Sequence, residues 1–239
     1  MAIIIIPARL ASTRLPNKLL LAETGKSLLH HTIDRARESK LANKIIVASE
    51  DQGILDVVPS DIITALTPKC FSGSERVAWV TENCVMPDNI VVNLQGDEPE
   101  LSGEHLDSLI QVLQDDSVVD VATLAAPANS LDYKSYSVVK TVLNHDGDAM
   151  YFSRCAIPYG AGSADNVWPL KHIGVYAYRR EFLLALSSME PTTLGSESLE
   201  QLQWLQSGFK IRVLERDIKT TGIDTIDEYQ SFVQRVGKF

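Results

Sequence analysis

Three cationic residues stand close together near the start of the chain, in the segment Pro7–Lys18. Arg9, Arg14 and Lys18 fall within ten residues, and small residues such as Ser12 stand between them. Like charges repel one another unless an anion joins them, and guanidinium and ammonium groups are good receptors for phosphate oxygens. The segment therefore indicates a site for a nucleoside triphosphate, although a solvated surface loop without a ligand would account for the same charges. It matches neither the Walker A motif nor the dinucleotide-binding glycine motif, so a phosphate site here must be of another kind.

A carboxylate follows a second apolar run, in the segment Gln95–Pro99. Gly96 allows a sharp turn and Pro99 ends the strand, so Asp97 is expected to project from the edge of a sheet. A carboxylate facing a polyphosphate is repelled unless a hard cation lies between them. Mg²⁺ is usually held by one or two carboxylates together with phosphate oxygens and water. Asp97 is thus a candidate metal ligand, and the alternative is an ordinary turn residue.

Polar residues in the second half of the chain are less informative by themselves. Asp224 stands just before the last expected helix, where aspartate commonly caps the first turn, so capping is the simpler explanation. His172 lies in an apolar run, where a hydrogen-bonded core histidine is the commoner case. The remaining candidates form no motif; they are Lys140, Arg154, Glu197, Glu200 and Gln201.

The elements that must position these residues alternate regularly in the first half of the chain. Unbroken β-branched runs predict buried parallel strands, and amphipathic segments between them predict helices. The expected strands are 3–6, 44–49, 62–66, 89–94 and 118–124, and the expected helices are 28–39, 51–58, 72–83 and 104–113. This alternation favours an α/β fold with a doubly wound, mostly parallel sheet of the Rossmann-like kind. Such sheets bind ligands beyond the carboxyl ends of their strands, which is where both loops above are expected.

The pattern loosens after about residue 125. Polar alternation predicts longer strands at 137–143 and 172–178, a loop is expected at 159–167, and helices are expected at 197–206 and 225–236. We expect one domain over residues 1–239, with an inserted antiparallel portion near residues 127–178.

Composition and charge exclude several classes of protein. The net charge is −9, whereas duplex-binding proteins usually carry a basic surplus, so nucleic acid is not an expected partner. Cys70, Cys84 and Cys155 have no metal-ligand spacing, and we expect buried, reduced thiols. The apolar run 2–6 is too short for a signal peptide or a membrane span, so a cytoplasmic protein is expected, with no membrane partner.

Several blocks of the sequence resemble the CMP-Kdo synthetases, the cytidylyltransferases of 3-deoxy-manno-octulosonate (Kdo). The first block is Ile5–Lys18, and the others follow in the order and spacing of the family. They are Ser72–Arg76, Val92–Pro99, Tyr151–Pro158, Lys171–Tyr178, Leu199–Leu202 and Thr221–Thr225. The resemblance covers nearly the whole chain.

The resemblance implies an enzyme that moves CMP from CTP onto a Kdo-type sugar acid, with Mg²⁺ as cofactor and pyrophosphate as the second product. It implies that Arg9, Ser12, Arg14 and Lys18 hold the CTP phosphates, that Arg76 and Gln95 lie near the base and ribose, and that Asp97 and Asp224 hold the metal. Lys18, Arg14, Asp97 and Asp224 are then the catalytic candidates. The residues implied for the sugar are Arg154, His172, Tyr176, Glu197 and Gln201.

The resemblance also implies a cytoplasmic homodimer that serves lipopolysaccharide synthesis. Residues 1–126 and 207–239 would form the nucleotide-binding core, and 127–206 the sugar-binding and dimerisation portion. A nucleotide-binding regulatory module without turnover is the rival from another class, and it has less need of two aspartates.

Departures from the family pattern all lie on the sugar side. Tyr159 stands where tryptophan is usual, a short loop follows at 160–164, and Gly195 stands where glutamate is common. Kdo, its 8-amino-8-deoxy analogue and a sialic-acid-like sugar therefore remain open as substrates.

Overall fold

The fold is described from a computed structural model. It describes residues 1–12, 14–84, 89–160, 169–189, 197–218 and 222–237. The sequence features at 161–164, Gly195 and Thr221 lie outside these residues.

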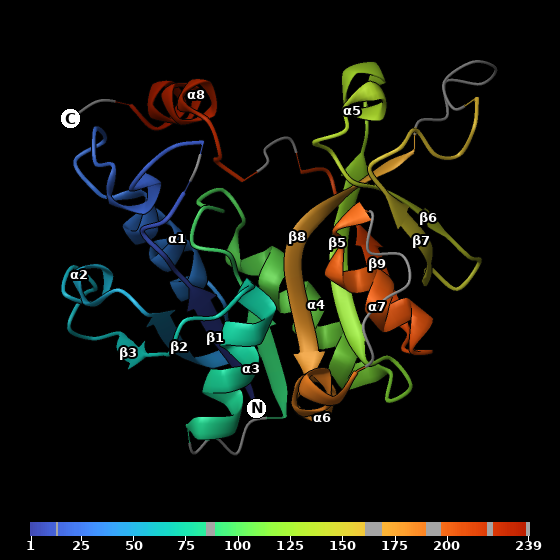
Figure 1. Cartoon of the computed structure of the whole chain (residues 1–239), viewed down its shortest axis with the longest axis horizontal. Coiled ribbons are helices and arrows are strands. Elements are labelled where there is room, and N and C mark those ends of the chain that lie inside the picture. Colours follow the sequence, from blue (N-terminus) through green and yellow to red (C-terminus); the bar gives the residue numbers. More distant parts are fainter. Residues whose placement is uncertain (13, 85–88, 161–168, 190–196, 219–221, 238–239) are drawn as a thin grey trace.

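A single twisted sheet forms the centre of the molecule, with strand order β3-β2-β1-β4-β8-β5-β9 (Figure 1). The parallel strands of its first half are β1 (Ala2–Pro7), β2 (Ala42–Ser49), β3 (Ile63–Leu66) and β4 (Ile90–Asn93). β8 (Leu170–Arg179) runs antiparallel to both β4 and β5 (Val121–Pro127), and β9 (Ile211–Glu215) runs parallel to β5. The expected mostly parallel sheet is confirmed.

The parallel core follows from the unbroken apolar runs. All six residues of β1 are buried, because β2 and β4 flank it and helices cover both of its faces. One face packs on α1 (Leu28–Arg37), α4 (Gly103–Asp115) and α8 (Ile226–Val236). The other packs on α3 (Gly73–Asn83), α6 (Arg180–Ala185) and α7 (Glu200–Gln206). This is the doubly wound arrangement that the alternation predicted.

An antiparallel extension lies at the end of the sheet opposite β3 (Figure 1). It consists of the hairpin β6 (Lys140–Leu143) and β7 (Ala149–Ser153) and the short helix α5 (Ser130–Lys134). β6 also pairs with the first residues of β8, whose later residues lie between β4 and β5. The last strand of the expected antiparallel portion is therefore part of the main sheet.

Some boundaries and elements differ from the sequence predictions. The helix expected at 51–58 is only α2 (Gln52–Leu55). Pro59 disfavours helical backbone in Val58, the residue before it, and nothing in the structure explains the earlier end at Leu55. Helices η1 (Lys18–Leu20), α5, η2 (Leu186–Ser188) and α6 are too short to show a helical period, and none of them was predicted. β7 and β9 were also missed. Cys70 is buried, but Cys155 is exposed, so the expectation of buried thiols is wrong for Cys155. No helix in the described residues is long and apolar enough to cross a membrane.

Candidate active site

The N-terminal cationic loop is anchored to the sheet by apolar residues. Leu15 and Leu19 are buried in the core cluster beneath α1 and α8. Between them Asn17 adopts the left-handed conformation, with φ of 54°, and begins η1. Asparagine tolerates this conformation better than most residues. The turn brings Lys18 to the residues that follow β4.

The loop and the end of β4 line a cavity of about 180 Å³. Its lining residues are Pro7, Arg9, Ala11, Ser12, Arg14, Lys18, Leu19, Gln95, Gly96, Asp97 and Asp224. The structure thus brings together every residue predicted for the phosphates and the metal, together with Gln95, which was predicted for the base and ribose.

Lys18 joins the two aspartates at the centre of this cavity. Its Nζ donates to Asp97 Oδ2 and, at 2.7 Å, to Asp224 Oδ1. Arg14 Nη2 donates to the other oxygen of Asp224 at 2.5 Å. Asp97 and Asp224 are 127 residues apart in the sequence, yet one ammonium group contacts both.

Charges in the cavity shift the titration of two groups. Burial by itself would lower the pKa of Lys18, but the negative charge of Asp97 and the hydrogen bonds to both aspartates outweigh it and raise that pKa. Glu98 as a whole residue is partly exposed, but its carboxyl group is buried. Burial raises the pKa of Glu98 well above its ordinary value, and the nearby charges of Asp97 and Asp224 act in the same direction. The site thus concentrates carboxyl groups around one lysine.

Asp224 is not the cap of the last helix. Thr225 caps α8, since its side chain accepts from Glu228 N while Glu228 Oε2 accepts from Thr225 N at 2.8 Å. The capping explanation for Asp224 is therefore wrong, and its carboxylate is free to face Lys18. The Thr-x-x-Glu spacing at 225–228 is a capping-box signal that distinguishes the two residues.

Two backbone contacts hold Asp224 beside Asp97. Ile223 N donates to Asp97 O at 2.9 Å, and the Ile223 side chain is buried in the core. Gly222 packs directly on the Glu98 carboxyl group, where an added Cβ would lie 2.7 Å from Glu98 Oε1. Sequence reasoning singled out neither Glu98 nor Gly222.

The cavity suits a hard divalent cation bound together with a phosphate. Two carboxylates converge on a cationic group, and oxygen ligands of this kind are those that Mg²⁺ prefers. The described residues contain no cluster of three or more acidic, histidine or cysteine side chains arranged to hold a metal ion. The remaining ligands would therefore come from phosphate oxygens and water.

Arg76, predicted for the base and ribose of CTP, is not among the residues that line this cavity. It is buried at the start of α3, where Nη1 donates to Thr67 Oγ1 at 2.7 Å and Nη2 lies 3.3 Å from Glu50 Oε2. Gln95 is at the cavity wall, and its Nε2 donates to Asn93 Oδ1 at 2.8 Å.

The residues predicted for the sugar lie along β8 and beside β7, outside the 180 Å³ cavity. His172 is placed between Phe152 and Tyr176, and its Nε2 is 3.0 Å from Thr123 Oγ1. Burial lowers the pKa of His172 to about 3, so the ring is neutral at pH 7. Tyr176 and Gln201 are buried, and burial raises the pKa of Tyr176 well above its ordinary value.

Arg154 and Glu197, both predicted for the sugar, contact each other. The Arg154 amide donates to Glu197 Oε2 at 2.9 Å, and Arg154 Nε donates to the Glu197 carbonyl at 3.2 Å.

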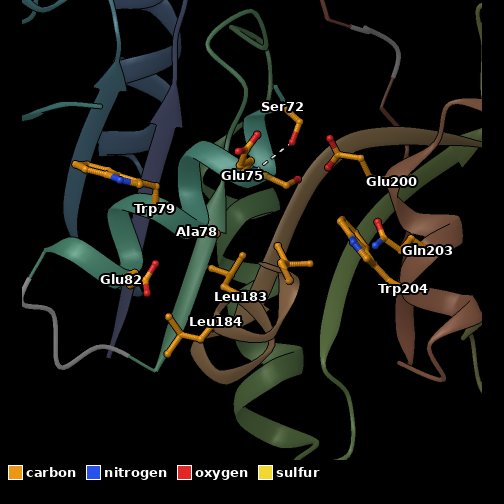
Figure 2. Close-up of a pocket in the computed structure, with 12 residues that line it drawn as sticks. Ser72, Glu75, Ala78, Trp79, Glu82, Leu183, Leu184, Glu200, Gln203 and Trp204 are labelled. Atoms are coloured by element: carbon orange, nitrogen blue, oxygen red, sulfur yellow. Dashed lines mark hydrogen bonds between the residues drawn. The ribbon is translucent and has the colours of Figure 1, made fainter. Parts of the chain in front are cut away.

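A second and larger cavity, of about 490 Å³, lies between α3, α6 and α7 (Figure 2). Glu75 and Glu200 stand on opposite sides of it, and Trp204 forms part of one wall (Figure 2). Glu75, Ala78, Trp79 and Glu82 recur at helical spacing along α3, a signal that sequence reasoning did not use. The cationic residues predicted for CTP line the smaller cavity, with the exception of Arg76.

Comparisons with known proteins show the family of the chain. Residues 3–217 match the family model described as cytidylyltransferase. The chain is 36% identical over 249 residues to the 3-deoxy-manno-octulosonate cytidylyltransferase of Geobacter metallireducens, covering 98% of this chain and 97% of that protein. It is 39% identical over 233 residues to the protein of the same name from Bdellovibrio bacteriovorus, covering 94% and 93% of the two chains. A solved structure of CMP:2-keto-3-deoxy-manno-octonic acid synthetase complexed with CTP superposes with a TM-score of 0.91, at 34% identity and 98% coverage of both chains.

Proposed function

The chain belongs to the cytidylyltransferase family, and from that premise we propose that it transfers CMP from CTP to a Kdo-type sugar acid, for lipopolysaccharide synthesis. The observation that carries the proposal is the bridge from Lys18 to Asp97 and Asp224 beneath the N-terminal cationic loop. A triphosphate and its divalent ion need cations for the phosphates and carboxylates for the metal within one small space.

The reaction forms one phosphorus–oxygen bond and breaks another. The C2 hydroxyl of the sugar acid attacks the α-phosphorus of CTP, the bond from that phosphorus to the bridging oxygen breaks, and pyrophosphate leaves. The hydroxyl proton is lost to water. Arg9, Arg14 and Lys18 hold the phosphates and stabilise the charge that moves onto pyrophosphate. To do so, Lys18 and Arg14 exchange their aspartate partners for phosphate oxygens.

Asp97 and Asp224 are the residues that would hold Mg²⁺. When bound there, the ion would supply Lewis-acid polarisation of the α-phosphate. The position of Lys18 supports this assignment. Its ammonium group lies between the Asp97 and Asp224 carboxylates, so the two side chains are already close enough to share one cation.

Pyrophosphate release tests the proposal. We expect CTP with Kdo and Mg²⁺ to release pyrophosphate, whereas CTP alone and UTP with Kdo do not. Asp97→Asn keeps the shape of the side chain and should lower turnover by roughly 10²–10³-fold, the usual cost of removing a group that stabilises transition-state charge. A folded Asp97→Asn variant with wild-type turnover would exclude the metal assignment. Binding of CTP with no pyrophosphate from any sugar acid would instead indicate a regulatory module.

The identity of the sugar needs its own assay. Kdo is the substrate in the names of the relatives, and 8-amino-Kdo and a sialic-acid-like sugar are the alternatives. Product analysis after parallel incubations with all three sugars distinguishes them, and we expect Kdo to give the highest kcat/KM.

We also propose that the protein is a homodimer in the cytoplasm. Large apolar side chains on the antiparallel extension are exposed, including Leu131 (77%), Tyr136 (73%) and Met150 (64%). Contiguous exposed apolar surface is typical of an interface between chains, and the dimer proposal requires that these side chains belong to one such surface. Light scattering should give twice the chain mass for wild type and less for Leu131→Glu, and a monomeric wild type would refute the dimer. The three free cysteines support a reducing compartment, which cell fractionation would test.

A further inference from the structure

A buried lysine lies in the antiparallel extension, apart from the phosphate cavity. Lys140 begins β6, and its side chain has no solvent contact. An ammonium group has three hydrogens. Here Nζ donates to three backbone carbonyls, those of Ser135 at 2.8 Å, Val138 at 2.7 Å, and Arg154. All the donors of this cation are therefore used to hold nearby backbone, and one of the three acceptors belongs to Arg154.

Arg154 is held from both sides of its backbone. Its carbonyl accepts from Lys140, and its amide donates to Glu197 Oε2 at 2.9 Å. Two nitrogens of the guanidinium group are also hydrogen-bonded. Nε donates to the Glu197 carbonyl and Nη1 donates to the Tyr136 carbonyl, both at 3.2 Å. No acceptor lies on Nη2 within the part of the chain that the structure describes. A guanidinium group held in this way has a fixed outer edge that can receive a carboxylate.

Both carboxylate oxygens of Glu197 accept hydrogen bonds from other residues of the protein. Ser153 Oγ donates to Oε1 at 2.6 Å, and the Arg154 amide occupies Oε2. Burial by itself would raise the pKa of Glu197, but these hydrogen bonds outweigh it and lower that pKa. The ordered carboxylate therefore shapes the backbone around Arg154, while the direct sugar contact that the resemblance implied for Glu197 stays a prediction.

We propose that Lys140 and Glu197 are positioning residues that preorganise Arg154 as the receptor for the carboxylate of the sugar acid, an inference that rests on the proposed function. Lys140 fixes the position of the Arg154 carbonyl, and Glu197 fixes the position of the Arg154 amide. The outer edge of the guanidinium group is then available to bind the carboxylate of the substrate. A binding group that is fixed before the substrate arrives loses less conformational entropy when the complex forms.

The neighbouring strand offers a matched control. Lys171 is the register partner of Lys140 in the pairing of β6 with β8, and it too is buried. Its Nζ lies 3.2 Å from Asp132 Oδ2 on α5, so its partner is a carboxylate and not the Arg154 backbone. Removing either lysine removes a buried cation from the same part of the sheet, but only Lys140 contacts Arg154.

The experiment compares wild type, Lys140→Met, Glu197→Ala and Lys171→Met with two substrates. One is Kdo, and the other is its carboxamide, which lacks the negative charge. Wild type should prefer the acid strongly. Lys140→Met and Glu197→Ala should raise KM for the acid by roughly tenfold to a hundredfold, the range expected for displacement of a binding group by about 1 Å. Their KM for the carboxamide and their affinity for CTP should change little, so the preference for the acid falls. Lys171→Met should keep the wild-type preference.

Each outcome decides one point. If Lys140→Met and Glu197→Ala keep the wild-type ratio of acid to carboxamide, the positioning role is wrong, even where overall activity falls. If Lys140→Met does not fold, Glu197→Ala carries the same decision. If wild type releases no pyrophosphate with Kdo, the proposed function itself fails, and the inference fails with it.

Discussion

Replacing Lys18 with methionine tests the electrostatics of the site most directly. Methionine keeps much of the length of the side chain but removes the charge that separates Asp97 from Asp224. We expect the free energy of unfolding to fall without metal, because the two carboxylates are then left close together and unneutralised.

The magnitude follows from the exposure of the three side chains. Lys18 is 11% exposed, Asp97 24% and Asp224 38%. Exposed ion pairs contribute roughly 0–1 kcal/mol, and breaking a fully buried pair costs about 3–5 kcal/mol. A loss of about 1–2 kcal/mol lies between these limits and corresponds to a Tm lower by roughly 2–8 °C for a chain of this size. Lys26→Met is the control, since Lys26 and its partner Asp34 are 58% and 36% exposed and the change should be under about 0.5 kcal/mol.

Magnesium should affect the two proteins differently. In the wild type the ammonium group of Lys18 competes with the ion for the same carboxylate oxygens, so Mg²⁺ without nucleotide should raise Tm little. In Lys18→Met the competitor is gone, and Mg²⁺ at tenfold its Kd would stabilise the fold by about 1.4 kcal/mol. Thermal unfolding with and without Mg²⁺ measures this. The reasoning is refuted if Lys18→Met is as stable as wild type without metal, or if Mg²⁺ shifts both proteins equally. Turnover should stay low in the variant at any Mg²⁺ concentration.

Three further changes have defined outcomes. Gly222→Ala places a Cβ 2.7 Å from Glu98 Oε1 and should raise the Mg²⁺ concentration needed for half-maximal pyrophosphate release, whereas Gly53→Ala, with no atom within 4 Å of its Cβ, should not. Burial lowers the pKa of His172 from 6.5 to about 3, so the unfolded chain binds a proton between these values that the folded protein does not. Stability should therefore fall as pH drops from 6.5 towards 3, by about 1–2 kcal/mol at pH 5, and denaturant titrations of His172→Gln should lack this slope. Thr225→Ala removes the cap of α8 and should lower the free energy of unfolding by about 1 kcal/mol; an unchanged denaturation midpoint would argue against this capping assignment.

Sequence patterns were sufficient for the parallel half of the fold. Each of β1, β2 and β4 is built on an unbroken apolar run, and a strand with both faces covered needs no other signal. The cationic loop and Asp97 could be placed at the same edge of the sheet, because parallel strands end at one edge. The predicted end of the helix at 58 was three residues too late, and only Val58 is disfavoured in a helix by the Pro59 that follows it.

The elements beyond residue 125 were harder to predict. β9 alternates buried Ile211 and Val213 with less buried neighbours, a strand signal that was present but only five residues long. α6 has only six residues and follows β8 without a break, so no helical period can develop. The position of β8 between β4 and β5 depends on pairings with strands far away in the sequence, and no local pattern records them.

Residue types alone indicated phosphate, carboxylate and metal chemistry, because charge and donor geometry belong to the side chain wherever it lies. Only the tertiary structure decided which of these groups meet. In the folded protein Arg76 contacts Thr67 and Glu50. The carboxylate of Glu197 accepts hydrogen bonds from Ser153 and Arg154. One backbone hydrogen bond connects Asp97 to the segment before α8. Such contacts depend on the packing of elements that are distant along the chain, so spacing in the sequence does not contain them.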